Sequence, residues 1–411
     1  MMFSLSKGVA FVQQSLTGRV AASLALLILA AGCSRQPNAE TATTHHASFQ
    51  AYQQETRQEV REKRSFQTES HDNELVWNTP FEVRPAVPSG KALLLLHGLG
   101  DSPWSFVDVA QDFAAQGYVV RVALLPGHGT KPEDLIDARL EEWQALVKEQ
   151  VALLRQEYPE VYLGGFSTGA NLALAYAIKD PAVSGLVLFS PAIRSSATYD
   201  WVTPWLAPVR TWLVSPNESR PQQSPVRYYN VPTNGFAQFY RSSVVVRDLI
   251  EHENFDRPVA IVLSEKDSVV DVHYVRELFK SRFTHPASRL IWYGQNNQAG
   301  AGNVADSSRI LTRSDRLADE RISQFSHMGI LFSPQNALYG RSGKLRFCWN
   351  GLNARDVARC EAGEEVWYSE WGYREPGKVH ARLTYNPYFA WQSQVIHEVL
   401  AAAGSGKKQI H

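Results

Sequence analysis

The sequence predicts an α/β domain built on a mostly parallel central sheet with helices on both faces. Two observations carry this prediction. Short apolar runs such as 92–96 and 185–189 alternate with amphipathic stretches such as 143–154, and short segments connect them. The runs are apolar throughout rather than alternately polar, which indicates strands buried on both faces.

The expected elements follow one another from about residue 92. Glycine or proline ends the apolar runs of the strands, and apolar residues at helical spacing mark the helices. The expected strands are 92–96, 118–124, one beginning at 161, 185–189, 259–263 and 290–293. The expected helices are 106–114, 143–154, 171–178 and a closing helix over 390–400. Ligands of such sheets bind beyond the carboxyl ends of the strands, so we expect the chemistry there.

Composition narrows the class of protein. The chain has 411 residues, of which 44% are hydrophobic and 20% charged, as in soluble globular proteins. Lys+Arg and Asp+Glu both total 41, so the net charge of zero argues against a nucleic-acid partner. No cysteine and histidine spacing typical of a zinc site is present. We therefore expect neither a metal nor an organic cofactor.

The first 33 residues indicate export. An apolar run over 20–31 follows cationic residues and is shorter than the ~20 residues that span a bilayer. Its end, Leu29 to Cys33, resembles the lipobox of bacterial lipoproteins, although the leucine lies one place early. That resemblance implies lipidation of Cys33, and Ser34 favours the outer over the inner membrane. We expect a lipid-anchored protein of the bacterial cell envelope, facing the periplasm or the exterior; an ordinary secretory signal is the alternative.

Residues 34–74 are predicted to be a polar tether. The segment is rich in Gln, Thr, Glu, Arg and His, and such a stretch buries too little apolar surface to offset its ordering entropy. A weak helix is possible over 49–66. The folded domain is expected over 75–403.

Cys348 and Cys360 lie twelve positions apart. In an oxidising compartment they can form a disulfide. Two unpaired buried thiols are the alternative.

A nucleophile motif lies between the third expected strand and the helix after it. The five residues 165–169 read Gly-Phe-Ser-Thr-Gly, which is the G-x-S-x-G pattern in the strand–turn–helix context that it requires. A sharp turn exposes the side chain of Ser167, and flanking glycines let the neighbouring backbone pack closely. The helix that follows brings free backbone N–H groups next to the serine.

With this motif, the chain resembles the α/β-hydrolase superfamily, and within it bacterial carboxylesterases and monoacylglycerol-lipase-like serine hydrolases. The resemblance covers about 75–335 and includes the His-Gly-Leu-Gly loop over 97–100 and Leu-Pro-Gly-His-Gly over 125–129. It implies that the backbone N–H groups of Leu99 and Thr168 form the oxyanion hole. His97 is then expected to support its loop.

The superfamily orders its catalytic residues as serine, acid and histidine. Asp267 follows the strand over 259–263 and precedes two valines, as in the acid loop of the family, with Asp271 and Glu265 as alternatives. His327 lies in a Ser-His-Met-Gly sequence that resembles the family's histidine loop. The resemblance therefore implies a Ser167–His327–Asp267 triad.

Two segments exceed a minimal hydrolase. Residues from about 191 to 257 break the alternation of strands and helices and contain many aromatic residues. Family members insert a lid at this place; a small core within the insertion is the alternative use of these aromatics. A second extra segment, about 334–387, holds Cys348 and Cys360.

The predicted function is hydrolysis of carboxylic esters by a serine hydrolase of the carboxylesterase or lipase type. The expected partners are a small-molecule or lipid ester and, through the N-terminal anchor, a membrane. One alternative is an acyltransferase or an aminopeptidase-like amidase, because the same triad serves any acyl acceptor. Another is a lipoprotein that keeps the fold as a non-catalytic binding scaffold.

Overall fold

The structure is a computed structural model that describes four stretches of the chain. They are residues 46–216, 221–295, 308–351 and 353–405. The expected export signal over 1–33 and its lipidation site Cys33 lie outside the described residues. Among the helices that are described, none is both long and apolar enough to cross a bilayer.

An eight-stranded sheet organises the domain. The strand order is β1-β3-β2-β4-β5-β8-β9-β10, and every neighbouring pair is parallel except β1 with β3. The strands are β1 (Phe81–Val83), β2 (Lys91–Leu96), β3 (Tyr118–Ala123), β4 (Glu160–Phe166), β5 (Val183–Phe189), β8 (Val259–Ser264), β9 (Arg289–Tyr293) and β10 (Ile310–Arg313). This confirms the predicted mostly parallel sheet. The two edge strands, β1 and β10, are only partly buried and therefore lack the apolar run that marks the others.

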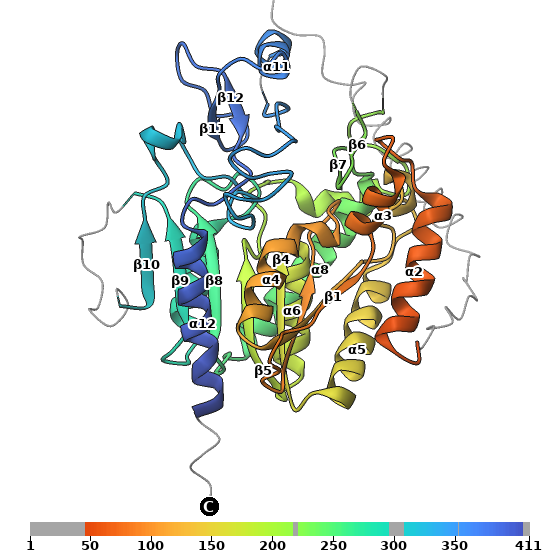
Figure 1. Cartoon of the computed structure of the whole chain (residues 1–411), viewed down its shortest axis with the longest axis vertical. Helices are drawn as coiled ribbons and strands as arrows, with labels where there is room; N and C mark the ends of the chain where they lie inside the picture. The colour runs from red at the N-terminus through yellow and green to blue at the C-terminus, as the bar shows by residue number, and fades with distance from the viewer. Residues whose placement is uncertain (1–45, 217–220, 296–307, 352, 406–411) are drawn as a thin grey trace, which may run out of the picture. The chain divides into compact units, whose positions relative to one another are not determined.

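Helices cover both faces of this sheet (Figure 1). They are α4 (Val107–Ala115), α5 (Leu140–Glu157), α6 (Thr168–Lys179), α8 (Thr233–His252), α9 (Val272–Arg282) and α12 (Phe389–Ser405). Apolar residues of α4 and α12 pack into one layer of the core, and those of α5, α6, α8 and α9 pack into the other. The expected closing helix, α12, lies across β8 and β9. The predicted α/β-hydrolase fold is thus confirmed.

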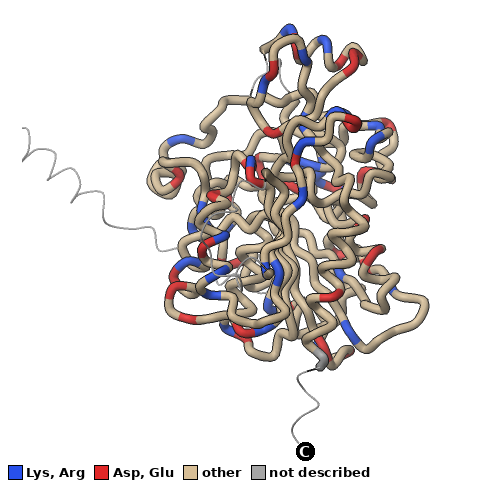
Figure 2. The backbone as a smooth tube through the Cα atoms, turned by 90° about the vertical axis from the view of Figure 1, so that its left-hand side faces the viewer, with Lys and Arg blue, Asp and Glu red and all other residues tan. Residues whose placement is uncertain are grey.

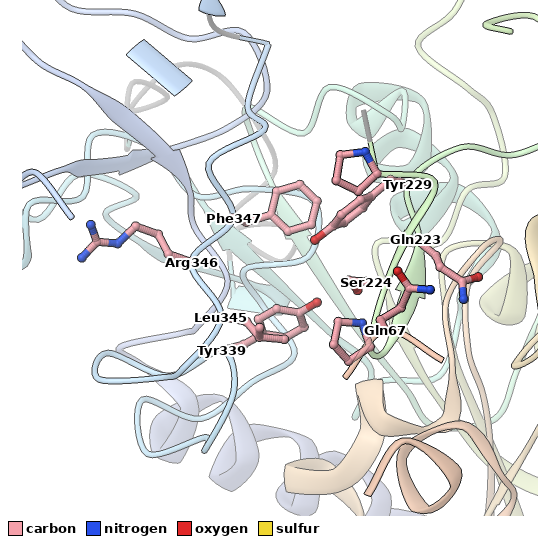
Figure 3. A pocket seen from close by; sticks show the side chains of 10 residues that line it. Gln67, Gln223, Ser224, Tyr229, Tyr339, Leu345, Arg346 and Phe347 are labelled. Carbon is pink, nitrogen blue, oxygen red and sulfur yellow. The ribbon is translucent and has the colours of Figure 1, made fainter. Parts of the chain in front are cut away.

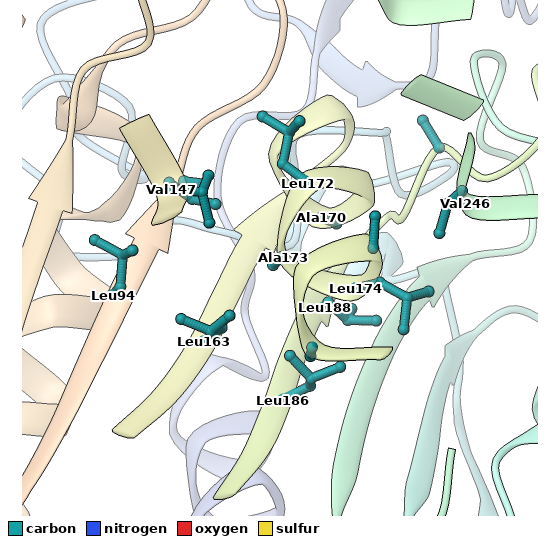
Figure 4. Packing of buried hydrophobic residues seen from close by; sticks show 14 of the residues in the cluster. Leu94, Val147, Leu163, Ala170, Leu172, Ala173, Leu174, Leu186, Leu188 and Val246 are labelled. Atoms are coloured by element: carbon teal, nitrogen blue, oxygen red, sulfur yellow. The ribbon is translucent and has the colours of Figure 1, made fainter. Parts of the chain in front are cut away.

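The leucine run of β2 shows why two layers are needed. Leu94 and Leu96 belong to the core layer under α5 and α6, whereas Leu93 and Leu95 belong to the layer under α4. All four side chains are fully buried. Figure 4 shows the first layer, in which Leu94 and Leu163 come from strands and Leu172 from α6. Each such leucine contributes roughly 1.5–3 kcal/mol by burial, which fixes the strands that carry the candidate site.

The expected tether over 34–74 is wrong for the residues that the structure describes. Helices α2 (Phe49–Lys63) and α3 (His71–Asn78) form most of the chain from residue 46 to residue 78. Phe49 and Tyr52 of α2 are buried in the main core. The folded domain therefore begins before residue 75.

A buried ion pair explains how so polar a segment is ordered. The side chains of Arg64 and Glu74 are 1% and 0% exposed, and Nη2 and Oε2 lie 2.8 Å apart. The Glu74 carboxylate also accepts hydrogen bonds from the backbone N–H groups of Gln67 and Thr68. Because these charges are paired inside the fold, the segment can be buried although its composition is polar. Its composition therefore does not predict whether it is ordered.

The expected lid over 191–257 has two structural parts. Its first part contains η3 (Asp200–Val202), α7 (Thr203–Leu206), β6 (Gln223–Ser224) and β7 (Arg227–Tyr228). Its second part is α8, which packs on α6 and buries Val246 and Ile250 in the main core. The exposed aromatic residues lie before the β6–β7 hairpin: Trp201 and Trp205 are 52% and 79% exposed, whereas Tyr228 of β7 and Phe239 of α8 are buried.

The C-terminal segment, residues 334–387, contains the predicted disulfide. Cys348 and Cys360 are bonded, and both are buried. Helix α11 (Ala354–Glu361) and the parallel pair β11 (Trp367–Ser369) and β12 (His380–Arg382) surround them. The disulfide shares a small apolar core with four residues, Val357, Val366, Val379 and Ala381. Over the described chain, basic and acidic residues are interspersed, in keeping with the net charge of zero (Figure 2).

Candidate active site

Ser167 stands on the turn between β4 and α6. Its backbone has φ 55° and ψ −115°, in the left-handed region that a non-glycine residue rarely adopts. A Cβ added to Gly165 would lie 2.3 Å from the backbone of Gly169, and one added to Gly169 would lie 2.0 Å from the Leu96 carbonyl oxygen. Only glycine fits at either place, so the local sequence fixes this turn at the carboxyl end of the sheet.

Leu99 and Thr168 lie on the two backbone segments that meet beside Ser167. Thr168 is the first residue of α6, so its N–H is one of the free donors of the helix start. In the described part of the chain, the N–H of Leu99 donates to no protein acceptor. Gly98 holds the two segments close, because an added Cβ there would lie 3.3 Å from the Cβ of Ser167. Two unpaired amides therefore flank the serine.

Two buried histidines support the loop over 97–100, which carries Leu99. The ring Nε2 of His128 accepts a hydrogen bond from the N–H of Gly100 at 3.0 Å, and Nε2 of His97 accepts one from the N–H of Leu125 at 3.1 Å. Burial lowers the pKa of His97 to about 4. Burial and the neighbouring His97 lower the pKa of His128 to about 3. Both rings are therefore neutral at pH 7 and act as acceptors, which agrees with the predicted supporting role of His97.

Asp267 and His327 form a buried hydrogen-bonded pair. Oδ2 of Asp267 lies 2.7 Å from Nδ1 of His327, and the two side chains are 0% and 9% exposed. Oδ1 of Asp267 accepts hydrogen bonds from the N–H groups of Val269 and Val270 at 2.8 and 3.0 Å. Burial opposes ionisation of Asp267, but His327 and the two amides outweigh it and lower the pKa of the carboxyl group. The pair has the geometry of an imidazole oriented by a carboxylate.

His327 lies on the same side of the sheet as Ser167. Its ring packs on that of Phe166, the residue before the serine, with 4.7 Å between the centroids. Its carbonyl oxygen accepts a hydrogen bond at 3.3 Å from the hydroxyl of Ser190, which follows β5, the strand beside β4. No hydrogen bond joins the Ser167 hydroxyl to His327 within the described residues. The sequence-predicted residues are thus brought together at one corner of the sheet, without a hydrogen bond between Ser167 and His327 in the part of the chain that the structure describes.

The two alternative acids have structural partners. Asp271 caps α9 by accepting from the N–H of Tyr274, and it pairs with Arg194 at 2.6 Å. Glu265 accepts from the indole of Trp292 and pairs with Lys266 at 2.9 Å. Neither contacts a histidine by a hydrogen bond that the described residues make.

Residues that the sequence analysis missed hold the histidine loop, residues 323–332. Ser264 donates to the carbonyl oxygen of Phe325 at 3.0 Å, and Glu370 accepts from the N–H of His327 at 2.6 Å. Ser264 ends β8 and Ser190 directly follows β5, and a polar residue at a strand end is a signal that could have been found. Glu370 lies in the C-terminal segment, and nothing in its local sequence marks it.

Two cavities of the described structure are lined by residues other than the site candidates. One, of about 270 Å³, lies between the β6–β7 hairpin and the C-terminal segment, and Figure 3 shows Tyr229, Tyr339 and Phe347 around it. The other, of about 460 Å³, lies beside the first part of the lid and includes Trp201 and Asp271. Neither cavity is lined by the catalytic candidates, each of which is less than a tenth exposed. In the described ranges, no group of three or more His, Cys, Asp or Glu side chains could hold a metal ion.

The parallel sheet, the strained serine turn and the acid–histidine pair define an α/β-hydrolase of the serine hydrolase class. Residues 88–294 match the family described as serine aminopeptidase, S33, and the chain belongs to this family. The match includes Ser167 and Asp267 but ends before His327.

Known proteins are similar to about half of the chain. The thermostable monoacylglycerol lipase of Bacillus sp. (strain H-257) is 28% identical over 184 residues, which are 43% of this chain and 71% of the lipase. A structure from work on LipS and LipT, two metagenome-derived lipolytic enzymes, covers 52% of this chain and 86% of its own, with a TM-score of 0.45 and 23% identity. The monoacylglycerol lipase of Paleococcus ferrophilus covers 52% of this chain and 88% of its own, with a TM-score of 0.43 and 16% identity.

Proposed function

We propose that the chain is a serine hydrolase that cleaves carboxylic esters through an acyl-enzyme. The observation that carries this proposal is the 2.7 Å Asp267–His327 pair at the end of the sheet where the Ser167 turn also lies. A serine hydroxyl is a weak nucleophile until a base takes its proton, and an oriented imidazole is such a base. The lack of a hydrogen bond between Ser167 and His327 among the described residues is compatible with this role, because catalytic hydrogen bonds are often long before substrate binds.

In the acylation step, Oγ of Ser167 attacks the carbonyl carbon of the ester while Nε2 of His327 takes the hydroxyl proton. Asp267 holds the Nδ1–H and stabilises the imidazolium that forms. The N–H groups of Leu99 and Thr168 stabilise the negative oxygen of the tetrahedral intermediate, and donors of this kind contribute about 3–4 kcal/mol each.

Collapse of the intermediate releases the alcohol, which receives its proton from His327. Water then attacks the acyl-enzyme, with His327 again taking a proton and returning it to Oγ of Ser167. The same histidine therefore acts in both half-reactions. No step needs a cofactor.

An acyl ester of glycerol is the substrate class that we favour. The similarity to a monoacylglycerol lipase supports an ester, and the exposed Tyr199, Trp201 and Trp205 give the first part of the lid an apolar surface suited to lipids. Lysophospholipids share this chemistry. The family's description as serine aminopeptidases supports the second candidate, an amidase that uses the same residues.

A panel of p-nitrophenyl esters of increasing acyl length, monoacylglycerols, lysophospholipids and aminoacyl p-nitroanilides tests these alternatives. We expect turnover of esters in excess of anilides, and a loss of at least about 10⁴-fold in Ser167→Ala. A fluorophosphonate probe should label wild type and fail to label Ser167→Ala. Activity that persists in the variant would refute the nucleophile, and a wild type that neither reacts with the probe nor turns over any substrate would favour the binding scaffold.

We also propose that lipidated Cys33 holds the enzyme on the bacterial envelope, most simply at the outer membrane. The support is the sequence from Leu29 to Ser34 alone. Metabolic labelling with a fatty acid should mark the wild type and leave Cys33→Ala unlabelled. Label on the variant would contradict the proposal.

A further inference from the structure

The histidine loop (323–332) is hydrogen-bonded along its length to the C-terminal segment (334–387). The N–H of Ser323 donates to the carbonyl oxygen of Tyr368 at 2.8 Å. The hydroxyl of Ser326 donates to the carbonyl oxygen of Leu383 at 2.6 Å and accepts from the N–H of Gly329 at 2.9 Å. The segment that exceeds a minimal hydrolase is therefore the support of the loop that carries His327.

Glu370 makes the most direct of these contacts. Its side chain is 3% exposed, and Oε2 accepts from the N–H of His327 at 2.6 Å. Oε1 accepts from the N–H of Trp371 and lies 3.1 Å from Nη2 of Arg382. His327 is thus held at two points by two carboxylates, its ring by Asp267 and its backbone by Glu370. Because the N–H groups of His327 and Trp371 and the guanidinium of Arg382 all contact the buried Glu370 carboxylate, the carboxylate has one orientation. It therefore fixes the backbone N–H of His327.

Arg382 is the cation that pairs with Glu370. Burial lowers the pKa of Arg382, whereas the carboxylates of Glu370 and Asp267 act to raise it. The guanidinium therefore lies within electrostatic reach of both acids.

The disulfide lies in the small core that presents Glu370 and Arg382. Glu370 follows β11 directly, and Arg382 ends β12, which pairs with β11 in register Ser369 with Arg382. Nε of Arg382 donates to Oδ1 of Asn350, two residues after Cys348, at 3.2 Å. The covalent bond and its apolar neighbours thus hold the two strand ends from which both charged side chains project.

We propose that the C-terminal segment positions the catalytic histidine, with Glu370 as the positioning residue. This inference rests on the proposed function, since it assigns His327 as the base. Glu370 acts through His327 and contacts neither substrate nor reacting atoms. Loss of its carboxylate should therefore slow both half-reactions and leave substrate binding largely unchanged.

Glu370→Gln tests this proposal. A glutamine keeps the shape of the side chain but replaces one acceptor oxygen by an NH₂ group. In either orientation this NH₂ group faces other donors, which are the N–H of His327 or the N–H of Trp371 and the guanidinium of Arg382. We expect kcat to fall about 10- to 100-fold, as for loss of a hydrogen bond to a charged group, with KM within about threefold. The rate at which a fluorophosphonate labels Ser167 should fall by a similar factor. In the His327→Ala background, Glu370→Gln should lower this rate no further.

Glu74→Gln is the matched control. Glu74 is also a buried carboxylate that pairs with an arginine and accepts backbone N–H groups, but it belongs to the N-terminal helices. Both variants should lower the melting temperature, and only Glu370→Gln should lower kcat and the labelling rate. Unchanged kcat in folded Glu370→Gln, or an equal loss in both variants, would overturn the proposal.

Ser326→Ala keeps the proposal testable if Glu370→Gln does not fold. It removes the hydroxyl that bridges Leu383 and Gly329, and we expect kcat to fall about 3- to 10-fold with little change in KM. An unchanged kcat would overturn the positioning role. Inactive wild type would instead refute the proposed function, so the two failures are distinguishable.

Discussion

Ser167 stands on a turn fixed by residues within a few positions of it, whereas His327 stands on a loop fixed by residues 43 to 137 positions away. The serine turn depends on glycines that let β4, α6 and β2 meet at backbone distance. The histidine loop depends on hydrogen bonds from the ends of β5 and β8 and from the C-terminal segment.

This difference separates two ways of building a catalytic site. A turn that only glycine can form is encoded by the local sequence. It is therefore easy to recognise and does not depend on hydrogen bonds from distant segments. A loop held by long-range hydrogen bonds depends on the stability of other parts of the fold. The matched family region, 88–294, contains the glycines of the serine turn as well as Ser190 and Ser264, whereas the C-terminal segment that also holds the histidine loop lies outside it.

Among the changes to residues that hold His327, Asp267→Asn should have the largest effect on kcat. The amide stabilises the wrong tautomer of His327 and leaves the imidazolium without a counter-charge, so we expect kcat to fall by about 10⁴. The control is Asp271→Asn, which keeps a cap acceptor for α9 but removes the charge that pairs with Arg194, and it should cost at most about 1 kcal/mol of stability with little loss of kcat. Comparable losses of kcat in both variants would contradict the choice of acid.

Among the changes to the turn that carries Ser167, Gly169→Ala should have the largest effect on stability. Its Cβ would overlap the backbone oxygens of Leu96 and His97, at 2.0 and 2.5 Å, and we expect loss of more than about 4 kcal/mol of stability or failure to fold. Gly363→Ala is the control, since nothing lies within 4 Å of its Cβ and only its φ of +88° opposes the change. That variant should lose about 1–2 kcal/mol. A stable, active Gly169→Ala protein would refute the steric account.

Low pH should destabilise the fold around the loop over 97–100, because His97 and His128 are buried in the neutral form. Their folded pKa values, about 4 and about 3, lie below the unfolded value near 6.5, so the unfolded chain binds more protons below pH 6.5. The free energy of unfolding should be constant above pH 6.5 and fall as pH decreases, by about 3 kcal/mol from His97 alone at pH 4. Urea unfolding at pH 7, 5.5 and 4 measures this, and a free energy that is equal at pH 7 and 5.5 would contradict it.

Removing the disulfide should have the smallest effect on kcat, and it should act through the support of the histidine loop. The Cys348→Ser, Cys360→Ser double variant should lose about 3 kcal/mol of local stability, because the closed loop is short. We expect kcat to fall up to about 10-fold, with KM and the pH dependence of unfolding unchanged. A larger loss of kcat than in Asp267→Asn would show that the disulfide supports the serine side as well.

The sequence predicts the sheet and the serine turn well, because apolar runs and glycines act locally. Cys348 and Cys360 were also predictable as a pair, since they are close in sequence. Helix α2 falls within the weak helix expected over 49–66, but neither its burial nor helix α3 was predicted, because the buried Arg64–Glu74 ion pair gives the segment a polar composition. Glu370 was unpredictable for a related reason: its role comes from a contact with a residue 43 positions earlier, and no local pattern marks it.

Trapping the acyl-enzyme tests the central claim most directly. Protein mixed with a p-nitrophenyl ester, quenched in acid within the first turnovers and digested can be mapped by mass spectrometry. The account predicts that the added acyl mass lies on the peptide that contains Ser167, and that the Asp267→Asn protein acquires it far more slowly. Acyl mass on another residue, or turnover without any acylated peptide, would contradict the account.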